Sequence, residues 1–269
     1  MYIKQLTNNE FKEFSKNFKP SSIYQTVEYA FTMNEQDFHT TFLGLVDNNE
    51  IKAASLILIQ KVNGFKYAYA PRGFLIDYND HVLLEIFTKE IKRYLGKNDI
   101  VAIKINPLII RNIYDENYNV INTNIQYESI FNNLKKLGYH HLGYNNFFEA
   151  LKPRFEAIID LNKNYESLFM DIDKSFRTKI RNADSDGIKI YHGDESNLEY
   201  LYLQTKRKYP RDLKYFKDLY NFFHRNNSID FYYSKLDTTT YLRKIQKQYE
   251  ECEFELNSLN NLLLNNHSN

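Results

Sequence analysis

A cation on a tight turn is the feature of this sequence with the clearest chemical use. The segment Tyr67–Asp77 has the sequence Tyr-Ala-Tyr-Ala-Pro-Arg-Gly-Phe-Leu-Ile-Asp, so an aromatic strand is expected to lead into a turn at Pro71-Arg72-Gly73. Proline restricts the local backbone, and Gly73 permits close approach by a ligand. A guanidinium in this place suits a phosphate or a carboxylate, which it binds through two hydrogen bonds. The alternative is a structural arginine that covers a hairpin edge or pairs with Asp77.

Polar side chains also occur at the end of an apolar strand and near the start of a helix. Asn106 precedes Pro107, and its carbonyl can accept a hydrogen bond from an incoming amine but cannot act as a base. The alternative is an asparagine that caps a turn. Arg211 and Tyr215 are four residues apart, so they share a face of a helix that Asp212 begins. A lone arginine near a helix start is usually solvated, so this pair needs supporting context.

A local basic ridge lies in the helix expected over Tyr165–Ala183 and ending at Gly187, in a chain whose net charge is only +1. The ridge consists of Lys174, Arg177, Lys179 and Arg181. The residues expected on the buried side of this helix are Leu168, Ile172, Phe176 and Ile180. Such a ridge commonly contacts nucleic-acid phosphates. The alternative, which the sequence alone favours, is solvated surface.

The order of these motifs resembles that of the Fem family of peptidoglycan-bridge aminoacyltransferases, from about Phe14 to the last helix. The matching segments are Tyr24-Gln25-Thr26, Pro71-Arg72-Gly73, Ile103-Lys104-Ile105-Asn106-Pro107, Leu137-Gly138-Tyr139, the basic helix Arg177–Gly187, and Arg211 with Tyr215. The resemblance implies two acetyltransferase-like (GNAT) domains. It also implies transfer of an amino acid, of the glycine, alanine or serine class, from aminoacyl-tRNA to the stem or bridge peptide of a peptidoglycan precursor.

The resemblance further implies roles for the matching residues. Binding of a lipid-linked or nucleotide-linked muropeptide precursor is expected from Arg211, Tyr215, Arg72, Gly73 and Tyr69. Asn106 is expected to orient the acceptor, and the basic ridge to bind tRNA. Aminoacyl-tRNA is the co-substrate, and no metal or other cofactor is implied. Two positions depart from the family. Many relatives have aspartate where this chain has Asn106, and a relative of the short type has a phosphate-binding cation where this chain has Met33. Phosphate binding here would then need Lys61, Arg72 or another cation in its place.

The hydrophobic pattern predicts a mixed α/β (α+β) fold. In the first part, helices are expected over Asn8–Asn17, Ser22–Asn34, Asp80–Leu95 and Glu128–Leu137, and strands over Thr40–Val46, Glu50–Gln60, Lys66–Ala70 and Ile100–Ile105. A loose connection is expected over residues 111–126. In the second part, strands are expected over Arg154–Leu161, Ile188–His192 and Ile229–Lys235, and helices over Tyr165–Ala183, Ser196–Arg207 and Leu213–His224. The order in the first part matches an acetyltransferase-like domain, although order alone is an analogy.

Three domains are predicted: a first GNAT-like domain over 1–152, the start of a second over 153–236, and the first helix of a coiled-coil arm over 237–269. Apolar residues from Tyr241 to Leu263, including Cys252, recur at intervals of three and four, as in one strand of a coiled coil. Family members continue well beyond residue 269, so the chain resembles the amino-terminal two-thirds of one. The resemblance implies a second arm helix that packs on the first, and this sequence contains only the first. We therefore expect self-association through the exposed seam of the arm helix.

Composition excludes several classes of protein. A pI near 7.7 is not that of a general polyanion binder, and the single Cys252 excludes an internal disulfide. Met1–Gln5 lacks a signal-peptide core, and the longest apolar run, Ala53–Ile59, is too short to span a membrane. A cytoplasmic protein is predicted, with peripheral contact at the inner membrane face at most.

Two other functions stay open. One is an inactive module that holds the precursor or tRNA without transfer, which Met33, Asn106 and the expected truncation favour. The other is an acyltransferase that uses an acyl-CoA or an acyl carrier. Such enzymes bind the pyrophosphate of the coenzyme with a glycine-rich loop, and the sequence has no Gly-x-Gly.

Overall fold

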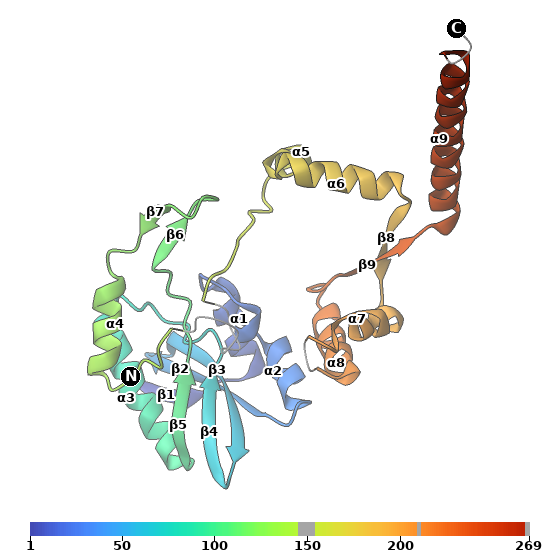
Figure 1. The fold of residues 1–269 in the computed structure, drawn as a ribbon. Helices are drawn as coiled ribbons and strands as arrows, with labels where there is room; N and C mark the ends of the chain where they lie inside the picture. The colour runs from blue at the N-terminus through green and yellow to red at the C-terminus, as the bar shows by residue number, and fades with distance from the viewer. Residues whose placement is uncertain (145–153, 209–210, 267–269) are drawn as a thin grey trace. The chain divides into compact units, whose positions relative to one another are not determined.

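The computed structural model describes residues 1–144, 154–208 and 211–266. The chain separates into two compact units (Figure 1). The first contains residues 1–144 and 204–229, and the second contains residues 145–203 and 230–269. Residues 204–229 therefore belong to the first unit, whereas the predicted boundaries put them in the second domain.

The first unit is built on a five-stranded sheet with the order β1-β2-β3-β4-β5. The strands are β1 (Tyr2–Gln5), β2 (His39–Asp47), β3 (Glu50–Val62), β4 (Phe65–Ala70) and β5 (Ile100–Ile105). Neighbouring strands are antiparallel except β4 and β5, which are parallel. The four strands predicted here are confirmed, whereas the short β1 was not anticipated.

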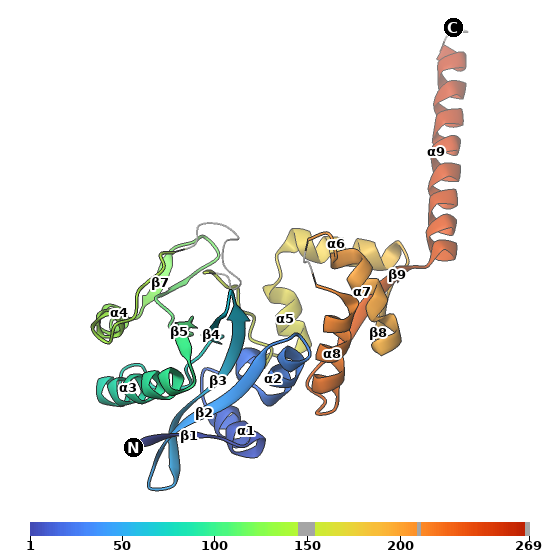
Figure 2. The same ribbon diagram turned by 90° about the horizontal axis from the view of Figure 1, so that it is seen from below.

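Helices cover both faces of this sheet, with α3 on one side and α1 and α2 on the other (Figure 2). The helical elements are α1 (Asn8–Asn17), the 3-10 turn η1 (Ile23–Gln25), α2 (Val27–Asn34), α3 (His81–Lys97), α4 (Tyr127–Lys136) and α8 (Leu213–His224). Each face has its own apolar core, one around α3 and one around α1 and α2. Because β3 is covered on both faces, Ala53–Ile57 is buried without alternation, which accounts for the long apolar run in the sequence.

The connection expected to be loose contains a small hairpin. Strands β6 (Asn112–Tyr114) and β7 (Val120–Thr123) pair in antiparallel fashion. Both strands are short and largely exposed, so they lack the strong apolar pattern by which the longer strands were predicted.

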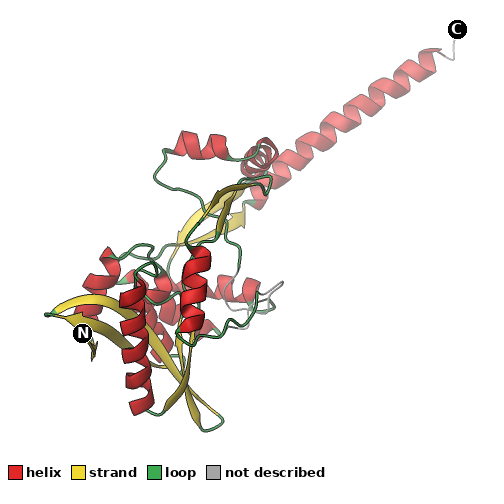
Figure 3. Ribbon diagram, turned by 90° about the vertical axis from the view of Figure 1, so that its left-hand side faces the viewer, coloured by secondary structure: helices red, strands yellow, loops and turns green. Residues whose placement is uncertain are grey.

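The second unit contains α5 (Tyr165–Asp171), α6 (Lys174–Ser185), β8 (Ile188–Gly193), the turn η2 (Glu195–Asn197), most of α7 (Leu198–Thr205), β9 (Phe231–Leu236) and α9 (Thr238–Asn266). Strands β8 and β9 form an antiparallel pair. The helix α9 is 29 residues long and is drawn as a single rod in Figure 3. Its apolar side chains, Leu256 and Leu259 among them, are exposed, and pairing of this helix with another stays a prediction.

Three predictions for the second unit are wrong. Residues 154–161 do not form a strand. The helix expected over Tyr165–Ala183 is two helices, because Asp173 caps a new helix through its side chain and the backbone of Ile172 is extended. Phe176 and Ile180, expected on the buried side, are 55% and 40% exposed.

Within the described residues, no helix is both long enough and apolar enough to cross a membrane.

Candidate substrate-binding site

The Pro-Arg-Gly turn at the end of β4 is held by a buried glutamine. The Gln25 Nε2 donates a hydrogen bond of 2.8 Å to the Pro71 carbonyl, and its Oε1 accepts one of 2.8 Å from the Leu56 N–H. Gln25 is 1% exposed. A Cβ at Gly73 would lie 2.8 Å from both the Gln25 Nε2 and the Ser55 Oγ, so the turn closes on these groups only with glycine. The reason for glycine here is therefore packing within the protein.

Asn106, at the end of β5, holds the same turn from a second strand. Its Oδ1 accepts hydrogen bonds from the Arg72 backbone N–H at 2.9 Å and from the Tyr69 hydroxyl at 3.2 Å. Arg72 has a φ of 54°, a left-handed conformation that is uncommon outside glycine. A carbonyl oxygen has two lone pairs, and both are engaged here. These contacts support the turn-capping alternative for Asn106.

Four tyrosines gather beside this turn. Tyr24 and Tyr29, from η1 and α2, pack edge to face with ring centroids 5.1 Å apart. Burial raises the pKa of Tyr29, the neighbouring Tyr215, Tyr24 and Tyr69 hydroxyls raise it further, and Arg211 opposes the shift. Burial also raises the pKa values of Tyr69 and Tyr215. Tyr29, Tyr69 and Tyr215 are therefore neutral hydrogen-bonding groups near pH 7.

The helix α8 brings Arg211 and Tyr215 to this cluster. Asp212 caps the helix by accepting a hydrogen bond of 2.8 Å from the Tyr215 N–H. Arg211 stands just before the cap, with its Cζ 5.0 Å from the centre of the Tyr215 ring. Arg211 is exposed and Tyr215 is half-buried, so the pair presents a cation and a hydroxyl at the surface of the first unit.

Packing and ion pairs hold α8 against α2. Phe223 is buried in the core that α1 and α2 share with β2 and β3. The Lys214 Nζ contacts Glu35, at the end of α2, at 2.9 Å, and it also contacts Asp218, within α8 itself, at 2.8 Å. Residues 204–229 thus supply the site with side chains that lie more than 100 positions from Asn106 in the sequence.

The structure brings together six of the residues predicted from the sequence: Tyr69, Arg72, Gly73, Asn106, Arg211 and Tyr215. Two other positions fall elsewhere. Met33 is buried in the apolar core of α1 and α2, and Lys61 pairs with Lys66 at the far end of β3 and β4 from Tyr69. Lys61 therefore does not replace the cation that is missing at Met33.

The basic ridge lies in the second unit, and two of its four members hold the local structure. The Arg177 guanidinium donates to the Met170 carbonyl at 2.6 Å and to the Ile172 carbonyl at 2.9 Å, which closes the end of α5. The Arg181 Cζ lies 5.6 Å from the centre of the Phe169 ring. Lys174 and Lys179 are exposed.

Sequence reasoning gave no role to Gln25 or Tyr29. In the sequence, Gln25 is an uncharged polar residue within Tyr24-Gln25-Thr26, just before an apolar pattern with helical spacing. Its carbonyl partner, Pro71, is 46 positions away, and spacing along the chain does not predict such a contact. Tyr29 was visible only as one aromatic residue among 23 tyrosines.

The model of the FemAB family matches residues 6–269, so the chain belongs to the FemAB family. It is 25% identical over 266 residues to a lipid II:glycine glycyltransferase of Staphylococcus haemolyticus, covering 95% of this chain and 60% of that protein. It is 27% identical over 261 residues to the aminoacyltransferase FemB of Staphylococcus epidermidis, covering 94% of this chain and 62% of that protein. The chain thus spans about 60% of the length of these relatives.

The crystal structure of FemX matches the structure of this chain with a TM-score of 0.72 and 22% identity, covering 96% of this chain and 63% of that one. At this identity the match shows the fold alone. It extends over both units of the chain, which agrees with a mixed α/β protein of the FemX type.

Proposed function

We propose that this protein is an aminoacyltransferase that moves an amino acid from aminoacyl-tRNA to an amine on the peptide of a lipid-linked peptidoglycan precursor. The relatives named above as a lipid II:glycine glycyltransferase and an aminoacyltransferase support the reaction class. The observation that carries the proposal is the meeting, in the first unit, of Gln25, the Pro71-Arg72-Gly73 turn and Arg211 with Tyr215.

The reaction needs little from the protein beyond positioning. The nitrogen of the acceptor amine attacks the ester carbonyl of the aminoacyl-tRNA, the new C–N bond forms, and the ester C–O bond breaks. The proton that leaves the amine passes to the departing ribose oxygen. Because the ester is already activated, holding the amine and the ester in contact accounts for much of the rate.

The site has the groups to hold an anionic precursor. Arg211 offers a guanidinium, which binds phosphate through paired hydrogen bonds. Tyr215 and Tyr69 add neutral hydroxyls. Gln25 and Asn106 fix the turn that carries Arg72, so this second cation has a set backbone position.

Precursor binding tests the site. Binding of a nucleotide-linked muropeptide is measured by calorimetry. The Arg211→Ala variant should lose about 1.5 to 3 kcal/mol of binding free energy, as expected for one charged hydrogen bond. Arg225→Ala is the matched control, because Arg225 lies at the other end of α8 with its Cζ 5.5 Å from the Phe222 ring. Equal affinities for the parent and Arg211→Ala would remove this site.

Transfer is then measured by incubating the chain with labelled aminoacyl-tRNA and a lipid-linked precursor. Label in the precursor peptide supports the proposed reaction. Binding of the precursor without transfer would identify a binding module instead, and loss of both would reject the proposed function.

A further inference from the structure

The end of the β3–β4 hairpin away from the candidate site exposes apolar side chains. Val62, Phe65, Tyr67 and Val101 are 44%, 58%, 42% and 57% exposed, and we call these four residues the hairpin patch. The turn at Asn63-Gly64 has two consecutive left-handed residues, which makes a narrow two-residue hairpin. The hairpin ends at the lower edge of the first unit in Figure 1.

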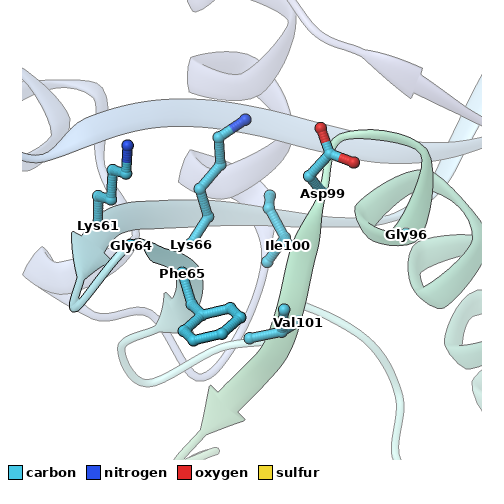
Figure 4. Close-up of a pocket in the computed structure, with 8 residues that line it drawn as sticks. All are labelled: Lys61, Gly64, Phe65, Lys66, Gly96, Asp99, Ile100 and Val101. Carbon is cyan, nitrogen blue, oxygen red and sulfur yellow. The ribbon is translucent and has the colours of Figure 1, made fainter.

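The members of the patch are neighbours. Val62 and Phe65 are opposite each other in the β3–β4 register, and Tyr67 follows Phe65 on the same face of β4. Phe65 and Val101 line one hollow, and Figure 4 shows their side chains side by side. The helices α1 and α2 pack on this face of the sheet farther along β3, around Leu56 and Leu58, and leave the hairpin end bare.

Cations lie behind the patch, on the other face of the hairpin. Lys61 and Lys66 line the same hollow, and Figure 4 shows their ammonium groups pointing to the opposite side from the Phe65 ring. Lys97 is also exposed, at the end of α3, and Asp99 is the carboxylate of the hollow. An apolar tip with lysines behind it matches the chemistry of an anionic bilayer, whose acyl region accepts the apolar side chains while its phosphates face the lysines.

We propose that the hairpin patch docks on the surface of an anionic phospholipid bilayer, with Val62, Phe65 and Val101 in the interface and Lys61 and Lys66 at the phosphates. The patch and the candidate site lie toward opposite ends of β4, and Tyr67 is two residues from Tyr69 on the same face of that strand, about 7 Å away. Docking in this way keeps the first unit, which carries the site, at the bilayer surface where lipid-linked molecules are found. This inference uses the proposed function only for that last consequence, since bilayer binding is measured without any precursor.

The chain contains no tryptophan, so a single introduced one reports on its own surroundings. In Phe65→Trp, anionic vesicles of phosphatidylcholine with phosphatidylglycerol should shift the emission to shorter wavelength, and vesicles of phosphatidylcholine alone should shift it less. The matched control is Tyr118→Trp, in the exposed β6–β7 turn, where Tyr118 is 87% exposed. Its emission should not move. No shift at position 65 with anionic vesicles, or an equal shift in both variants, overturns the proposal.

Vesicle sedimentation separates the two parts of the patch. Phe65→Ser should weaken binding roughly tenfold, and Lys61→Gln with Lys66→Gln should weaken it by about fivefold for each lysine, with the difference disappearing at high salt. Lys16→Gln with Lys19→Gln, two exposed lysines near α1, is the charge control and should bind as the parent does. If the control pair weakens binding equally, attraction is a property of the whole surface and the patch is rejected.

An emission shift in Phe65→Trp that depends on protein concentration without lipid would assign the patch to self-association instead.

Binding of the soluble nucleotide-linked precursor should be the same in Phe65→Ser and the parent, because Phe65 lies outside the candidate site. The two proposals therefore fail separately. Vesicle binding without precursor binding rejects the proposed function alone, and precursor binding without vesicle binding rejects the docking patch alone.

Discussion

The side-chain oxygen of Asn106 lies 2.9 Å from the backbone nitrogen of Arg72 and accepts its hydrogen bond. This contact joins the end of β5 to the turn that follows β4, two strands that run parallel. Gln25 holds the other side of the same turn through the Pro71 carbonyl. Two amide side chains from distant segments therefore fix a left-handed residue that would otherwise adopt other conformations.

Asn106→Ala should destabilise the protein by about 1 to 3 kcal/mol, because the Arg72 N–H is left without its acceptor in a part-buried place. Asn106→Asp keeps an acceptor of the same shape and should retain the parent stability and precursor affinity. Urea unfolding and calorimetry measure both. The control is Asn132→Ala, an exposed position on α4. Equal stability of Asn106→Ala and the parent would contradict this support of the turn.

Gln25→Ala should have a larger effect, about 2 to 4 kcal/mol, because it leaves both the Leu56 N–H and the Pro71 carbonyl without their buried partner. Gln126→Ala is the control: Gln126 is exposed, makes no side-chain cap at α4, and should change stability by about 0.5 kcal/mol or less. Unfolding midpoints compare the two. Similar destabilisation in both would mean that the buried glutamine does not hold the turn.

The elements of the first unit followed from the sequence where the apolar pattern is strong. Asn8–Asn17, Ile100–Ile105 and Leu213–His224 have the predicted bounds. Each has either a clear cap, such as Thr7 or Asp212, or a run of β-branched residues. Local chemistry is enough to predict such elements.

Contacts between distant segments were not accessible in this way. The assignment of α8 to the first unit depends on Phe223 entering the core around α2, and a buried phenylalanine has no sequence signal for its partner. The use of Arg177 to close α5 was likewise missed, because a helix pattern continues through Ile172 in the sequence while Asp173 begins a new helix in the structure. The family resemblance supplied the site residues that spacing alone did not bring together.

Docking of α8 should depend on packing more than on its ion pairs. Phe223→Ala removes a buried ring and should cost about 3 to 5 kcal/mol. Lys214→Ala should cost much less, because exposed ion pairs contribute little. Both are measured by chemical unfolding. Precursor affinity should fall in Phe223→Ala, since α8 carries Tyr215, and stay unchanged in Lys214→Ala; the reverse order would show that the salt bridges position the helix.

The capping box at α1 should give a small pH dependence of stability. The hydrogen bond from Lys4, together with those from Thr7, lowers the pKa of Glu10 to about 2. A carboxyl whose pKa is lower in the folded state stabilises the protein above its unfolded pKa, and this stabilisation disappears as the pH falls. The parent should therefore be more stable than Glu10→Gln at pH 5 to 7, and the difference should shrink from about pH 4.5 toward pH 2. A difference that is constant across this range would contradict the shift.

The part of the basic ridge that is open to tRNA can be tested without disturbing the fold. Arg177 and Arg181 contact α5, so replacing all four cations would confuse removal of charge with disruption of structure. Lys174→Gln with Lys179→Gln removes only exposed charges. If the ridge binds tRNA, this pair should lower the slope of log affinity against log salt by about two, because each lysine that no longer neutralises a phosphate lowers it by about one. Arg243→Gln with Lys247→Gln, two exposed positions on α9, is the control for total charge in the same unit. An unchanged slope in the Lys174 and Lys179 variant, or an equal change in the control, would show that the ridge is ordinary solvated surface.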